Sequence, residues 1–176
     1  MWRYSYNSNP AFNFIHEPYA KWIRVNRIRI RIKIKSIGLK TPQESSGMKE
    51  NNNSQSVIVD IMLAHGSKDP MWRKSFEDLL EKSKKRSPKK IFLLCYLELC
   101  RPSLSETVQD LVDSYYKIST INIHPIFLSA GVHFNEDIQK IVSDLKGIYP
   151  HLKFNVNDVV GNNSFVSNAI LKVVTS

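Results

Sequence analysis

The sequence has few cysteines and no long apolar segment. Only two of its 176 residues are cysteine, Cys95 and Cys100, so there is no disulfide framework and no second cysteine pair to complete a zinc site. We interpret both as reduced thiols, packed as small hydrophobic side chains, in a cytosolic or similarly reducing compartment. No stretch reaches the roughly 18 apolar residues of a membrane-spanning helix, and no secretory signal is recognisable.

Nucleotide-binding loops and hydrolase motifs are missing as well. The sequence contains neither GxGxxG nor GxxxxGK[ST], which argues against the common phosphate-binding loops. The triplet His65-Gly66-Ser67 is not part of a GxSxG elbow, so Ser67 is not expected to be a hydrolase nucleophile.

The positive charge is concentrated at the start of the chain. Residues 1–47 carry nine Lys or Arg against two Asp or Glu, which leaves a net +2 on residues 48–176 out of the total of +9. Basic and aliphatic residues alternate over Arg27–Lys35 with the period of a strand, and Thr41–Ser56 has the polar composition of a linker. We expect residues 1–56 to be a disordered leader and linker. A translation start at Met48, a basic binding arm and a targeting segment are the alternatives.

From Val57 onward, apolar runs alternate with helical patterns. Strands are expected over residues 57–63, 90–99, 121–128 and 153–160, and helices over 69–86, 102–117, 135–148 and 164–174. Asp69 and Pro70 suit the start of the first helix, and Ser103 with Glu106 forms a capping box for the second. The pattern predicts an α/β fold with a single flavodoxin-like three-layer α/β/α unit and a four-stranded parallel sheet.

Two histidines follow strands of this predicted sheet. Right-handed crossovers place the carboxyl ends of all strands at one edge, where ligands of open α/β sheets bind. His65 follows the first strand and His133 follows the third. In a strand order of 2-1-3-4 these two strands are neighbours, so we expect the two imidazoles to face one small cleft.

The chemistry open to two imidazoles is narrow. Neutral imidazole binds iron, cobalt, nickel and zinc, and it also accepts a proton near neutral pH. Two imidazoles alone would hold a metal loosely, which suits a metal in transit better than a structural ion. For each of the two histidines, the alternative to metal binding is a structural role in helix capping or backbone hydrogen bonding. His124 and His151 are interpreted as a core residue and a solvent-exposed loop residue.

Three segments together resemble a known enzyme family: LAHGSKDPMW, YLELCRPSL and PIFLSAGVHFNEDI. They are similar to the short sirohydrochlorin chelatases of the CbiX/SirB type, which insert cobalt or ferrous iron into the tetrapyrrole sirohydrochlorin. The resemblance covers residues 57–176 and leaves the leader outside. It implies a cytoplasmic homodimer in cobalamin or sirohaem biosynthesis. It also implies that no cofactor is permanently bound. The substrate would be a divalent metal, Co²⁺ or Fe²⁺, with Ni²⁺ as a further candidate.

The resemblance also assigns roles to residues. His65 falls on the histidine that binds the metal and is proposed to take a pyrrole proton, and His133 falls on the second metal ligand. Glu98 matches an acidic position, where it would orient a histidine or relay a proton; pairing with a lysine is the alternative. The segment that contacts the macrocycle corresponds to Leu128, Ser129, Ala130, Gly131 and Val132.

Arg101 departs from the family pattern, because many relatives have an acidic residue before this proline. An arginine can still serve there, since sirohydrochlorin carries eight carboxylates and arginine pairs with carboxylate bidentately. Ser67 and Lys68 are further donors expected near the substrate carboxylates. A solvated residue at a helix start is the alternative for Arg101.

Two other function classes stay open at this point. One is a tetrapyrrole or metal carrier with the same fold and no turnover. The other is nucleic-acid binding through Arg24–Lys35, which the nearly neutral remainder of the chain disfavours. The resemblance therefore implies sirohydrochlorin as partner, and the charge and hydropathy patterns predict no nucleic acid and no membrane span.

Overall fold

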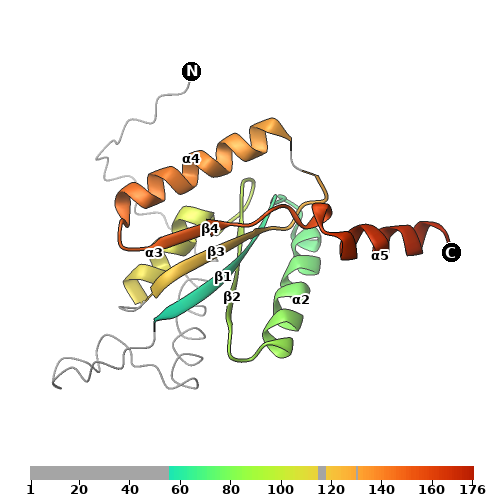
Figure 1. Cartoon of the computed structure of the whole chain (residues 1–176), viewed down its shortest axis with the longest axis horizontal. Helices are drawn as coiled ribbons and strands as arrows, with labels where there is room; N and C mark the ends of the chain where they lie inside the picture. The colour runs from blue at the N-terminus through green and yellow to red at the C-terminus, as the bar shows by residue number, and fades with distance from the viewer. Residues whose placement is uncertain (1–55, 115–117, 130) are drawn as a thin grey trace.

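The computed structural model describes residues 56–114, 118–129 and 131–176 (Figure 1). The basic segment Arg27–Lys35 and nearly all of the expected leader and linker lie outside these ranges. Strands and helices alternate along the described chain: β1 Val57–Ala64, α2 Pro70–Arg86, β2 Ile91–Tyr96, α3 Leu104–Ser114, β3 Ile118–Pro125, α4 Val132–Ile148, β4 Lys153–Val156, the short 3₁₀ helix η3 Val160–Asn162, and α5 Ser164–Val174.

The four strands form one parallel sheet in the order β2-β1-β3-β4. This confirms the predicted order and makes β1 and β3 neighbours. In the middle of the sheet, Ile61 of β1 lies between Leu93 of β2 and Ile123 of β3. All three strands therefore end toward the same edge.

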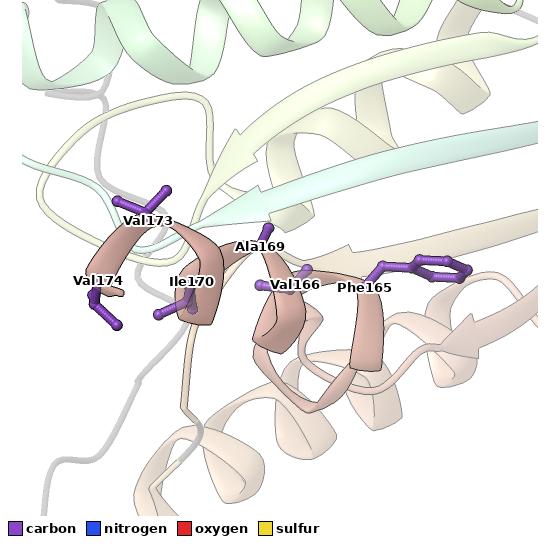
Figure 2. A pocket seen from close by; sticks show the side chains of 6 residues that line it. All are labelled: Phe165, Val166, Ala169, Ile170, Val173 and Val174. Carbon is purple, nitrogen blue, oxygen red and sulfur yellow. The ribbon is translucent and has the colours of Figure 1, made fainter. Parts of the chain in front are cut away.

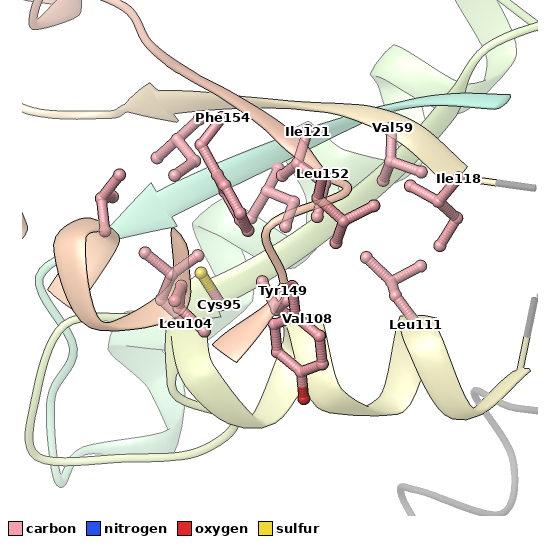
Figure 3. Close-up of a cluster of buried hydrophobic side chains, with 14 of the residues drawn as sticks. Val59, Cys95, Leu104, Val108, Leu111, Ile118, Ile121, Tyr149, Leu152 and Phe154 are labelled. Carbon is pink, nitrogen blue, oxygen red and sulfur yellow. The ribbon is translucent and has the colours of Figure 1, made fainter. Parts of the chain in front are cut away.

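Helices cover the sheet on both faces, as a three-layer unit requires (Figure 1). Val59, Ile61 and Leu63 of β1 are fully buried in a core that includes residues of α3 and α4, and Figure 3 shows Val108 and Leu111 of α3 near this core. Met62 and Ala64 of β1 belong to a second cluster on the other side, which includes residues of α2. Burial on both faces explains why the strands read as nearly continuous apolar runs.

The helix starts follow the predicted capping chemistry. The Met71 amide donates to Asp69 Oδ1 at 2.8 Å, and Pro70 is the first residue of α2. At α3, the Glu106 amide donates to the Ser103 hydroxyl at 3.2 Å while the Ser103 amide donates to Glu106 Oε2 at 2.9 Å. These contacts confirm the capping box.

Several element boundaries differ from the prediction. β2 ends at Tyr96 and β4 at Val156, and β3 runs from Ile118 to Pro125. Helix α4 begins at Val132 rather than Asn135, because its N-cap is Gly131, which makes no side-chain cap bond and so gives no local sequence signal. His133 therefore belongs to the first turn of α4.

Within residues 56–114, 118–129 and 131–176, no helix combines the length and the apolar character that crossing a membrane requires.

Candidate functional site

His65 lies directly beyond the carboxyl end of β1. Its side chain is 51% exposed, so the imidazole is accessible to solvent at the predicted ligand-binding edge. The next residue, Gly66, has φ of +105°. A Cβ atom there would lie 1.8 Å from the carbonyl oxygen of Glu98, so only glycine fits this close backbone approach.

Glu98 is held beside His65 by the backbone. After β2 ends, the Leu97 amide donates to the Ala64 carbonyl at 2.9 Å and the Glu98 amide donates to the His65 carbonyl at 3.0 Å. The Glu98 carboxylate then reaches the imidazole, with Oε1 3.4 Å from His65 Nε2. The structure thus brings together the two residues that the sequence assigned to proton handling.

Phe127 is a neighbour of His65 that the sequence did not single out. The two rings meet edge to face, with centroids 6.2 Å apart and an interplanar angle of 65°. Phe127 is held in place because the Ile126 amide donates to the Leu63 carbonyl at 2.8 Å and the Gly161 amide donates to the Phe127 carbonyl at 2.9 Å. Its position in the PIFL segment, two residues beyond the end of β3, was the available signal.

The segment after β3 lies at the same edge. Leu128 is 67% exposed, and Ser129 and Gly131 are also exposed. Ala130 lies outside the described residues, and the side chains of Val132 and His133 lie outside the described part of α4. The backbone places His133 in the first turn of α4, after the strand that neighbours β1. A shared cleft for the two imidazoles stays a prediction.

The three expected donors to the substrate have different surroundings. The Ser67 hydroxyl accepts a hydrogen bond from the Asp69 amide at 3.1 Å. Lys68 is exposed. The Arg101 guanidinium pairs with the Glu106 carboxylate and is 60% exposed, so this contact ties Arg101 to the first turn of α3.

His124 takes part in a polar cluster rather than packing only in the core, which corrects the sequence interpretation. Its Nε2 lies 2.9 Å from Oδ1 of the buried Asp60, and its Nδ1 lies 2.9 Å from Nδ2 of Asn157. The Asn157 amide group donates to Nδ1, which leaves Nε2 as the donor to Asp60. Asn122 Nδ2 also donates to Asp60 Oδ1, at 3.0 Å.

The surroundings of Asp60 determine its charge state. Burial opposes ionisation, yet the hydrogen bonds from His124 and Asn122 and the positive Lys90 outweigh it and lower the pKa of the Asp60 carboxyl. By contrast, full burial raises the pKa of the Cys95 thiol well above its usual range. Cys95 therefore stays a protonated core thiol, in line with the sequence interpretation.

Among the side chains that the structure describes, no three His, Cys, Asp or Glu residues gather closely enough to enclose a metal ion. His65 and Glu98 form a pair of candidate ligands at the sheet edge.

Comparison with known proteins gives a consistent pattern. The model of the CbiX family matches residues 60–176. The sirohydrochlorin cobaltochelatase of Methanopyrus kandleri is 28% identical over 86 residues, which cover 49% of this chain and 59% of that protein. The sirohydrochlorin cobaltochelatase of Methanococcus maripaludis is 28% identical over 87 residues, with the same two coverages. The aligned stretch thus spans less than two thirds of either relative.

Solved structures share the fold. The putative cobalamin biosynthesis CbiX protein from Marinobacter aquaeolei superposes with a TM-score of 0.58 at 28% identity, covering 67% of this chain and 92% of that one. The sirohydrochlorin chelatase SirB of Bacillus subtilis subspecies spizizenii, solved in complex with cobalt, gives a TM-score of 0.59 at 18% identity. That match covers 68% of this chain and 50% of SirB, and it shows similarity of fold.

Proposed function

The chain belongs to the CbiX family, and from this premise we propose that it is a sirohydrochlorin chelatase that inserts Co²⁺ or Fe²⁺ into the tetrapyrrole. The observation that carries the proposal is the exposed His65 imidazole at the sheet edge, with the Glu98 carboxylate 3.4 Å away. The relatives named sirohydrochlorin cobaltochelatase support Co²⁺ as the first metal to test.

In this proposal the metal arrives on imidazole nitrogen. His65 and His133 present the divalent ion, which suits imidazole as a ligand, and the ion exchanges these ligands and water for the four pyrrole nitrogens. Loose binding by few protein ligands favours release into the macrocycle. The macrocycle lies across the edge and contacts Leu128 to Val132, and the exposed Leu128 side chain offers an apolar surface to its flat face.

Insertion also requires that two pyrrole protons leave. A neutral His65 ring accepts one of them as a general base, and water at the open edge accepts the other. The adjacent Glu98 carboxylate stabilises the imidazolium that results and then passes the proton to water, since both side chains are about half exposed. Because the metal brings two positive charges as two protons leave, the charge on the macrocycle core is conserved.

The carboxylates at the macrocycle rim need cationic and hydrogen-bonding partners. Lys68 is exposed near His65 in sequence, and the Ser67 hydroxyl lies in the same turn. Arg101 already pairs with a carboxylate, Glu106, so a substrate carboxylate would share or take over this contact. We assign orientation of the substrate to these three residues.

Residues 57–176 form the chelatase domain, which acts as a homodimer in the cytoplasm, without a permanent cofactor. The product serves cobalamin synthesis if the metal is cobalt and sirohaem synthesis if it is iron. Ni²⁺ is a further candidate substrate, because imidazole accepts it too.

Anaerobic metallation of sirohydrochlorin tests the function directly. Absorbance of the tetrapyrrole is followed after mixing with Co²⁺ or Fe²⁺, for the full chain and for His65→Ala and His133→Ala. His151→Ala is the matched control, because His151 is an exposed histidine that follows α4 at the other end of the helix from His133.

We expect metallation faster than the uncatalysed reaction, with the acceleration lost in His65→Ala and His133→Ala and kept in His151→Ala. Tight binding of sirohydrochlorin without any acceleration would contradict the chelatase proposal and identify a carrier. Metallation rates of all three variants equal to that of the wild-type chain would exclude His65 and His133 from the mechanism.

A further inference from the structure

The edge of the sheet opposite the candidate site carries a cluster of positive charge. Residues 82–90 run from the second half of α2 to the residue before β2, and six of them are basic: Lys82, Lys84, Lys85, Arg86, Lys89 and Lys90. All six are exposed except Lys84, which is partly buried. Figure 1 shows this segment at the end of the sheet where β1 begins, and we call residues 82–90 the basic edge.

Ordinary structural roles account for only part of this charge. Positive side chains in the last turn stabilise a helix through its dipole, which explains Lys84–Arg86. Lys90 lies 3.7 Å from the buried Asp60 carboxylate and so supports its charge. Neither role applies to Lys82, which precedes the last turn, or to Lys89, which lies beyond the helix. These two side chains are available to an external anion.

Other exposed residues extend the surface at this end of the sheet. Lys153, the first residue of β4, is exposed. Ile58 in β1 is 53% exposed, and Ile148 at the end of α4 is 65% exposed. Two negative residues, Asp110 and Asp113, are on α3, which packs on the other face of the sheet from α2. The edge therefore combines a basic α2 side with exposed isoleucines.

The basic leader joins the described structure at this same edge. β1 begins at Val57, so residues 1–56 precede the start of a central strand. Residues 1–47 have a net charge of +7 and contain seven aromatic residues. In Arg27–Lys35 every second residue is isoleucine. The leader and the basic edge thus bring positive charge and apolar side chains to one end of the protein.

This combination favours a lipid surface over other polyanions. Positive charge alone would attract any polyanion, including nucleic acid. Isoleucine side chains gain free energy at the boundary between headgroups and acyl chains, and tryptophan and tyrosine favour that region too. Stable attachment to a bilayer requires two signals, such as an apolar segment and a polybasic patch. The leader supplies the first and shares the second with the basic edge.

Helix α5 also exposes apolar residues, but it lacks the charge. Figure 2 shows the side chains that line a pocket along this helix: Phe165, Val166, Ala169, Ile170, Val173 and Val174. Lys172 is the only charged residue of α5, so the helix offers little attraction to anionic lipid. The turn before α5 lies at the site edge, because the Gly161 amide donates to the Phe127 carbonyl at 2.9 Å. Helix α5 is therefore an internal comparison for apolar surface without charge.

We propose that the basic edge and the leader bind the surface of an anionic lipid bilayer. His65 follows β1, whose eight residues span about 26 Å, so the candidate site lies at the end away from the lipid. Attachment is peripheral, and the site stays open to metal and tetrapyrrole from solution. The proposal rests on the proposed function only for the use of this orientation.

Cosedimentation of the full chain with lipid vesicles tests the attachment, without metal or tetrapyrrole. We expect binding to vesicles in which about a third of the lipid is phosphatidylglycerol, and at least about 10-fold weaker binding to pure phosphatidylcholine. Raising the salt from about 0.1 M to about 0.5 M should weaken binding to the anionic vesicles, since it screens the charges.

Charge position is tested with two triple variants that lose the same charge. Lys85→Gln, Arg86→Gln and Lys89→Gln together should lower partitioning to anionic vesicles by about 10- to 100-fold. Lys74→Gln, Lys140→Gln and Lys172→Gln together change exposed lysines away from the basic edge and should change partitioning by less than about threefold. Equal losses in the two triple variants would overturn the role of the basic edge.

The kind of partner is tested by removing apolar side chains at constant charge. Ile28→Ser, Ile30→Ser, Ile32→Ser and Ile34→Ser together should lower vesicle binding by about 10-fold or more, because burial of aliphatic surface is lost. Vesicle binding that survives these four changes, or tighter binding to a DNA duplex than to anionic vesicles at the same salt, would overturn the lipid proposal.

The last comparison is at α5. Phe165→Ser with Val173→Ser removes exposed apolar surface there and should leave vesicle binding unchanged. A loss of binding in this variant would place the contact at α5 and overturn the proposal. None of these readouts depends on metallation, so failure of the chelatase function and failure of membrane attachment are distinguished.

Discussion

His65 and Glu98 are held together twice, once by backbone and once by side chain. The Glu98 amide donates to the His65 carbonyl at 3.0 Å, while Glu98 Oε1 lies 3.4 Å from His65 Nε2. Because the backbone bond fixes both residues independently of the carboxylate, the charge of Glu98 can be removed without displacing His65. A variant of Glu98 can therefore test the role of its carboxylate in metallation without changing the position of His65.

Glu98→Gln should slow metallation and leave the fold intact. We expect about a 10- to 100-fold loss of rate, because the amide no longer stabilises the protonated imidazole. The free energy of unfolding should change by less than about 0.5 kcal/mol, since the Glu98 side chain is 54% exposed. The measurements are the initial rate of sirohydrochlorin metallation and urea denaturation.

Glu81→Gln makes the same change on the α2 surface, where Glu81 pairs with Lys84, and should keep the wild-type rate. A Glu98→Gln rate equal to that of Glu81→Gln would exclude Glu98 from proton handling.

Gly66→Ala should strongly destabilise the protein. The added methyl group would meet the Glu98 carbonyl oxygen at 1.8 Å, and the φ of +105° is unfavourable for alanine. We expect a loss of about 2–4 kcal/mol in the free energy of unfolding, measured by urea denaturation.

The matched control is Gly147→Ala in α4. Apart from the neighbouring residues and backbone of α4 itself, no heavy atom lies within 4 Å of a Cβ there, so helix propensity predicts unchanged or slightly higher stability. Equal stability of the two variants would show that the segment after His65 adjusts without cost.

Local signals were enough to predict most of the fold. The alternation of strands and helices, the α2 and α3 caps and the bounds of α5 follow from periodicity and capping residues that act within a few positions. The strand order instead came from the flavodoxin-like fold class. The contact of Gly66 with Glu98 was not predictable in this way, because its partner arrives from a loop more than 30 residues later. Nor was the start of α4 at Val132, since Gly131 offers no side-chain cap.

Arg101→Ala separates a substrate contact from a structural one. The Arg101 side chain is 60% exposed in its pair with Glu106, so loss of the pair should cost about 1 kcal/mol of stability or less. If Arg101 also meets a carboxylate of sirohydrochlorin, KM should rise by about 2- to 10-fold with little change in kcat, as for loss of one partly exposed ion pair.

Arg86→Ala, at the opposite end of α2 from the site, controls for the loss of one positive charge. A KM that changes equally in both variants would point to general electrostatic attraction rather than contact at position 101.

Asp60 should make the stability of the protein depend on acid pH. Its pKa in the folded state is lowered from the usual value of 3.8, with the opposing effect of burial outweighed by His124, Asn122 and Lys90. A depressed folded-state pKa contributes stability above the unfolded pKa, and this contribution is lost as pH falls from about 4 through the folded-state pKa. Asp60→Asn should therefore cost about 1–3 kcal/mol at pH 7, where the buried carboxylate is ionised and hydrogen-bonded.

The difference in the free energy of unfolding between Asp60→Asn and the wild type should shrink below pH 4. At that pH the wild-type carboxyl becomes protonated and is then uncharged, like the asparagine side chain. Urea denaturation between pH 3 and pH 7 measures this convergence, with the exposed Asp78→Asn as control. A difference that stays constant over this range would mean that shape and hydrogen bonding at position 60, rather than charge, stabilise the sheet.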